Sequence, residues 1–232
     1  MKYKDFERII SAERMTRYVQ ACCGDTRKAM TLYRYNVELA QTAFAIISFF
    51  EVALRNAINS HLSARFGNEW LKNSVMPNGI FTLPILSKTR DIIYFAYNKL
   101  QRDNAYSHTK LLAEMEFGIW KYMFSPIQYR QTGRDLLRIF PNRPRSSAQA
   151  QYNPSYIFNE LDKINTLRNR IAHHEPICFP AQGEQIYTDY IRNEYQKMQV
   201  LLEWMGIKSS VFLYGIDHVN RVCKKIDRLK PV

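Results

Sequence analysis

The stretch LRNRIAHHEP, residues 167–176, gathers side chains that could act on a phosphate ester. An imidazole can transfer protons, an arginine can hold a phosphate, and an amide can orient the imidazole ring. Arg168, Asn169 and His173 therefore form a candidate site for RNA cleavage in which a 2′-hydroxyl attacks the neighbouring phosphate. Such chemistry requires no metal. The same residues could instead form a metal site, an RNA clamp or only a basic helix end.

A helix predicted from about residue 155 to residue 174 would position this cluster. At about 100° per residue its apolar side chains form one stripe, made of Ile157, Leu161, Ile164, Leu167 and Ile171. His173 points almost directly away from the stripe and shares a face with Asn169, whose amide could fix the imidazole tautomer. His174 lies closer to the stripe and is predicted to pack against the core. Arg168 falls at the edge of the stripe and diverges from His173 by about 140°, so a site that uses both residues predicts an unwound helix end or a homodimer.

Other chemistries find less support in the sequence. Adjacent histidines point in different directions on a helix, and no third ligand follows at the spacing of a zinc motif, so no metal and no cofactor is expected. The four cysteines form no CxxC pair and are predicted to be free thiols of a reducing compartment. The absence of a glycine-rich phosphate loop and of a GxSxG motif excludes the usual NTPases and α/β-hydrolases.

The composition predicts a soluble protein that binds polyanions. The 232 residues carry a formal charge of +12, which favours nucleic acid as a partner. The N-terminus lacks the apolar core of a signal peptide. The most apolar run, TAFAIISFFEVAL, is shorter than the roughly 20 residues needed to cross a bilayer, so it is predicted to be a buried core helix. We therefore expect a cytoplasmic protein with no membrane partner.

Basic residues are dense from Lys121 to Arg145 and in the last helix. Arg130, Arg134 and Arg138 are predicted to lie on one helical face and, together with Arg170, to bind substrate phosphates. A solvated helix face without a ligand is the alternative.

Apolar residues at three- and four-residue spacing predict an all-α fold. Helices are expected over about 4–21, a short segment before residue 37, and then 37–66, 87–103, 107–125, 155–174, 188–206 and 217–230. Residues 141–154 are rich in proline and polar residues and are the best linker candidate. We expect an N-terminal extension over 1–30, a main helical domain over 31–206, and a basic C-terminal helix over 207–232 that packs on the same domain.

Three segments, ISFFEVALRNAINSHL, EMEFGIWKYMFS and LDKINTLRNRIAHHEPI, resemble the Abi-like (abortive infection) proteins of bacteria. The last one also resembles the Arg-Asn-x-x-x-His signature of the HEPN superfamily, with Arg168, Asn169 and His173 at the signature positions. The resemblance covers roughly residues 30–205. It implies a HEPN-like helical bundle, commonly dimeric, with metal-independent RNase activity and antiviral output in many relatives. Other relatives are non-catalytic RNA binders or work with a regulatory RNA or an antitoxin, and this alternative stays open.

Overall fold

The computed structural model describes residues 1–231, and over this range the chain contains only helices and loops. This confirms the predicted all-α class, whereas the likeness to a HEPN bundle stays a prediction. The chain divides into two compact units that each join segments far apart in the sequence. The predicted division into residues 1–30, 31–206 and 207–232 stays a prediction.

The first unit comprises Met1–Phe49, Thr166–Val200 and the segment that begins at Lys208. Its helices are α1 (Tyr3–Ile10), α2 (Ala12–Ala21), the beginning of α3 (Thr26–Phe66), the end of α9 (Pro154–Ala172), most of α10 (Asp189–Trp204), α11 (Ser209–Phe212) and α12 (Val219–Asp227).

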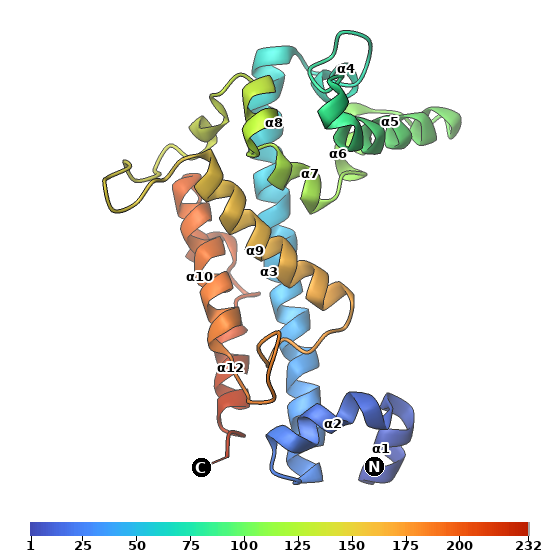
Figure 1. Cartoon of the computed structure of the whole chain (residues 1–232), viewed down its shortest axis with the longest axis vertical. Coiled ribbons are helices and arrows are strands. Elements are labelled where there is room, and N and C mark those ends of the chain that lie inside the picture. Colours follow the sequence, from blue (N-terminus) through green and yellow to red (C-terminus); the bar gives the residue numbers. More distant parts are fainter. Residues whose placement is uncertain (232) are drawn as a thin grey trace. The chain divides into compact units, whose positions relative to one another are not determined.

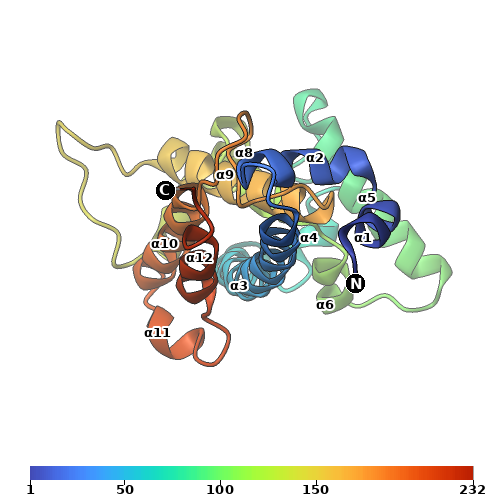
Figure 2. The ribbon, with the colours of Figure 1, turned by 90° about the horizontal axis from the view of Figure 1, so that it is seen from below.

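Polar contacts tie α12 to two neighbouring helices of the first unit. Asp227 accepts hydrogen bonds from Thr188 and Arg192 at the start of α10. Lys225 Nζ lies 2.7 Å from Glu38 Oε1 on α3. Figure 2 shows α10 and α12 side by side next to α3. The basic helix α12 is thus held against α3, which supplies many of the buried side chains.

The second unit comprises Phe50–Asn165 and Leu201–Ile207. It contains the rest of α3, followed by α4 (Trp70–Asn73), η1 (Pro84–Leu86), α5 (Ser87–Arg102), α6 (His108–Ala113), α7 (Phe117–Tyr122), α8 (Pro126–Gln131), η2 (Leu136–Ile139) and the beginning of α9. Figure 1 shows α4 to α7 grouped near one another. Asn59 on α3 helps to hold this group, because its Oδ1 accepts from Trp70 Nε1 at 2.8 Å and lies 2.9 Å from His108 Nε2.

Several predicted helix bounds were wrong at the N-terminal end of the chain. The helix expected over 4–21 is broken at Ser11, whose φ of 88° ends α1 and whose side chain caps α2 by accepting from Arg14 N. The long helix begins at Thr26 instead of residue 37. Asp25 explains this start, because its Oδ1 accepts from the backbone N–H groups of Arg27 and Lys28 at 3.0 Å each. The single helix expected over 107–125 is two short helices, α6 and α7.

The long helix α3 is apolar enough, by length and composition alone, to cross a membrane. Core helices of soluble proteins pass the same test. One face of α3 is fully buried in each unit, with Leu39, Ala43 and Ile47 in the first and Phe50, Leu54, Ile58 and Leu62 in the second. This buried stripe at helical spacing is the pattern of a core helix.

Candidate functional site

The candidate site lies at the C-terminal end of α9, in the first unit. The helix starts at Pro154, where Asn153 Oδ1 accepts from Tyr156 N at 3.0 Å. Four members of its apolar stripe, Ile157, Leu161, Ile164 and Leu167, are buried, and Ile171 is half-buried. Its regular part ends at Ala172, two residues earlier than the sequence indicated. The chain turns away through His174, which has a left-handed backbone with φ of 56°.

Asn169 and His173 are both exposed on the outer side of this helix end. The exposure of His173 confirms the direction predicted from the helical wheel. Within residues 1–231 the two residues are joined only through the backbone, with His173 N donating to Asn169 O at 2.9 Å. The expected hydrogen bond from the Asn169 amide to the imidazole is therefore wrong for a single chain, and the imidazole remains accessible from solution.

Arg168 is half-buried, which agrees with its predicted place at the edge of the stripe. Within the described residues its guanidinium makes no hydrogen bond or ion pair with another side chain. A cation that is neither fully buried nor neutralised can bind an anion without breaking an existing contact.

Arg170 has different surroundings from its neighbours. It is only 8% exposed. Its Nη2 donates to Pro176 O at 2.7 Å and to Phe179 O at 3.2 Å, and its Nε donates to Glu175 Oε2 at 3.3 Å. These bonds fix the segment that follows the helix. Its predicted role in binding substrate stays untested, but the contacts give Arg170 a structural role.

The predicted packing of His174 against the core is wrong. Its side chain is exposed, because the helix ends before it and the wheel no longer applies. Its backbone oxygen accepts from Arg14 Nη1 at 2.9 Å. His174 thus contributes its backbone conformation to the turn, while its side chain borders a groove.

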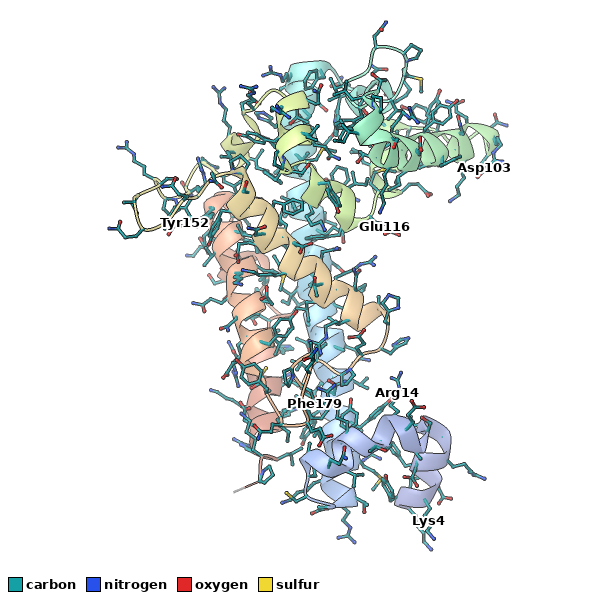
Figure 3. The ribbon with its side chains drawn as sticks, viewed as in Figure 1. Lys4, Arg14, Asp103, Glu116, Tyr152 and Phe179 are labelled. Carbon is teal, nitrogen blue, oxygen red and sulfur yellow. The ribbon has the colours of Figure 1, made fainter. Side chains whose placement is uncertain are left out.

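A groove of about 650 Å³ lies beside the helix end. Ala172, His174 and Glu175 form one border, and Arg14 on α2 lies on another. Aromatic and aliphatic side chains of α1, α2 and α3 line the walls, among them Ile10, Tyr18, Tyr33, Val37 and Phe44. Figure 3 labels Arg14 on α2 and Phe179 in the segment after α9. The groove combines flat apolar walls with a guanidinium next to the motif.

Asn36 holds the segment beside this site in place, and none of the sequence motifs pointed to it. It lies on α3, is 6% exposed and lines the same groove. Its Oδ1 accepts from Ile177 N at 2.8 Å and from Cys178 N at 3.0 Å. The signal was present in the sequence, because Asn36 is a polar residue at helical spacing between Leu32 and Leu39.

Two titratable groups near the groove are held in their neutral forms. Burial raises the pKa of the Tyr18 phenol well above its usual value. Burial likewise raises the pKa of the Cys178 thiol. Neither side chain can act as an anionic nucleophile at neutral pH. Among residues 1–231 no group of three or more His, Cys, Asp or Glu side chains could hold a metal ion.

Arg130, Arg134 and Arg138 lie in the second unit and are all exposed. The prediction that they share one helical face is wrong. Helix α8 ends at Gln131, and positive φ angles of 101° at Gly133 and 62° at Arg134 break the chain before η2. Their role in binding substrate stays a prediction. Arg130 lies on α8, Arg134 in the turn and Arg138 in η2, so the three form no continuous basic stripe on one helix.

The fold and the site define a class of protein: an all-α chain in which the sequence Arg-Asn-x-x-x-His lies at an exposed helix end. The sequence matches the family described as Abi-like protein over residues 3–178, and the chain belongs to this family. No match was found among curated proteins or among solved structures. Membership in the Abi-like family indicates a role in abortive infection defence.

Proposed function

We propose that this Abi-like protein acts on RNA in the cytoplasm and that the end of α9 is a metal-independent endoribonuclease site. The observation that carries the proposal is that His173 points into solvent, while Arg168, on another side of the same helix end, is half-buried and has no charge partner in the described chain. His173 would transfer the proton of the 2′-hydroxyl or of the departing 5′-oxygen. Arg168 would hold the scissile phosphate.

The groove and the net charge support RNA as the substrate. A base can stack on flat side chains such as Tyr33 and Phe44, and Arg14 lies at the same opening. The formal charge of +12 attracts a polyanion. Arg130, Arg134 and Arg138 would add sequence-independent phosphate contacts.

A symmetric homodimer is part of the proposal. Arg168 and His173 diverge by about 140° around one helix. Two copies with their α9 ends together would let Arg168 of one chain and His173 of the other approach the same phosphate.

The alternative is a non-catalytic RNA-binding module that works with a regulatory RNA or an antitoxin. One observation favours it, since within residues 1–231 no side chain orients the His173 imidazole. Catalytic histidines are normally held by a hydrogen bond to the second ring nitrogen.

The test is cleavage of labelled RNA in EDTA by the parent protein, His173→Ala and Arg168→Lys, with the molar mass of each sample followed by light scattering. We expect the parent to be a dimer that leaves a 2′,3′-cyclic phosphate. We expect His173→Ala to cleave at least about 100-fold more slowly at an unchanged melting temperature. Arg168→Lys keeps the charge but loses the planar fork, so a phosphate clamp should fail with it.

His174→Asn is the matched control, because His174 is the adjacent exposed histidine and asparagine tolerates its positive φ. It should lose much less activity than His173→Ala, because the His174 side chain borders the groove but takes no part in the proposed proton transfer. A folded His173→Ala protein with parental activity would refute the enzymatic proposal. If the parent protein binds RNA but neither it nor any variant cleaves it, the result would support the binding module.

A further inference from the structure

The second unit contains a cleft of about 740 Å³ whose residues take no part in the site on α9. It lies where η1 and the first turns of α5 meet α7 and the start of α8. Its apolar walls are Ile85, Leu86, Ile92, Ile119, Tyr122 and Ile127. Both the volume and the mostly apolar walls are those of a small-molecule site, for which about 300–1,000 Å³ is usual.

One polar side chain in the cleft has an acceptor atom that receives no hydrogen bond from the described residues. Gln128 is 3% exposed and lines the cleft from α8. Its Nε2 donates to Thr89 Oγ1 at 2.6 Å. Its Oε1 is buried, and within residues 1–231 no donor reaches it. A buried acceptor without a donor destabilises the fold, so a ligand that supplies an N–H group there would recover a hydrogen bond.

The rim of the cleft carries two carboxylates and one ammonium group. Glu114 Oε2 is held by Lys99 Nζ at 3.1 Å. Glu116 is exposed at the start of α7, where Figure 3 labels it, and within the described residues it forms no ion pair. Lys88 on α5 is the one cation that lines the cleft. Because Lys99 already neutralises Glu114, Glu116 is the rim carboxylate that stays open to a ligand, and an ammonium group can pair with it without breaking an existing contact.

We propose that this cleft binds a small cationic nitrogen heterocycle whose ring N–H donates to Gln128 Oε1, whose flat body packs on the isoleucine walls, and whose amine lies near Glu116. The proposal does not depend on the RNase site, because every residue that it uses lies in the second unit.

The test uses tryptamine, 1-methyltryptamine and indole-3-acetate as probes, with binding to the full-length protein measured by calorimetry. Tryptamine carries the ring N–H and the ammonium group. 1-Methyltryptamine has a methyl group in place of the ring N–H hydrogen and so lacks the donor, and indole-3-acetate reverses the charge. We expect tryptamine to bind about tenfold more tightly than 1-methyltryptamine, as one hydrogen bond allows, and indole-3-acetate to bind more weakly than tryptamine. Equal binding of the two amines, tighter binding of the acid, or no binding of tryptamine would overturn the proposal.

Variants locate the binding event. Ile85 lines the cleft and Phe95 does not, yet both side chains are 70% exposed. Ile85→Ser should therefore weaken tryptamine binding several-fold, whereas Phe95→Ser should leave it unchanged. Gln128→Leu should bind the two amines equally. If Gln128→Leu does not fold, the comparison of the two amines on the parent protein still decides.

A second copy of the chain is the competing occupant. Failure of both amines to bind, together with loss of self-association in Ile85→Ser but not in Phe95→Ser, would assign the cleft to a protein interface and overturn the small-molecule proposal.

Discussion

Replacing Asn36 by alanine should loosen the segment that follows the motif helix. In the folded chain Asn36 Oδ1 accepts from the backbone N–H groups of Ile177 and Cys178, and all three residues are buried. The substitution leaves two buried donors without an acceptor. Each such donor costs about 1–3 kcal/mol, and alanine recovers about 0.7 kcal/mol or less of helix propensity. A net loss of about 1–5 kcal/mol is therefore expected.

For a chain of this size, 1 kcal/mol corresponds to about 2–4 °C in melting temperature, so a loss of 3 kcal/mol should lower the transition by about 6–12 °C. Calorimetry gives this shift, and hydrogen exchange shows whether the amides of Ile177 and Cys178 open first. Asn193→Ala is the control, because Asn193 is exposed on α10. If Asn36→Ala melts like this control and the two amides stay protected, the assigned role of Asn36 is wrong.

Two further predictions concern charged side chains. Arg170→Met should lower the free energy of unfolding by about 2–4 kcal/mol, because the carbonyl oxygens of Pro176 and Phe179 lose the donor that they share. Arg168→Met should lower it by less than about 1 kcal/mol. Equal losses in thermal denaturation would contradict the separate roles given to these arginines. The hydrogen bond between His61 and Asp135, helped by Arg65, holds the pKa of the Asp135 carboxyl below its ordinary value of 3.8. Because the folded chain has the lower pKa, this carboxylate stabilises the fold above pH 3.8 and the contribution is lost as the pH falls through the folded pKa. Asp135→Asn should therefore flatten the acid side of the stability profile measured by urea denaturation from about pH 5 to pH 2, and an unchanged profile would count against the contact.

The sequence predicted the class of the fold and the helix that carries the motif, because both depend on local periodicity. Helix α9 was expected over about 155–174 and is found over Pro154–Ala172. The early start of α3 was missed although Asp25, a preferred helix-capping residue, marked it. The break at Ser11 was also marked by a residue type that commonly caps helices.

Within the site, the sequence predicted directions better than contacts. The wheel placed His173 outward and Arg168 at the edge of the stripe, and both are found there. It failed for His174, because a wheel assumes regular geometry and the chain leaves the helix at Ala172. The burial of Asn36 could be read from its place on an apolar face, but its two partners lie about 140 residues away in the chain. No local pattern encodes such a pairing.

Some of the cations at the end of α9 donate hydrogen bonds that close the helix end, and others do not. A helix end needs donors for its free carbonyl groups and favours positive charge nearby. Here Arg14 already donates to the His174 carbonyl, and Arg170 donates to two carbonyls of the segment beyond. The turn is therefore satisfied without Arg168 or His173, neither of which donates from its side chain to any group within residues 1–231. Because the fold does not use these two side chains to close the helix, both are available to bind the phosphate of the RNA substrate that we propose.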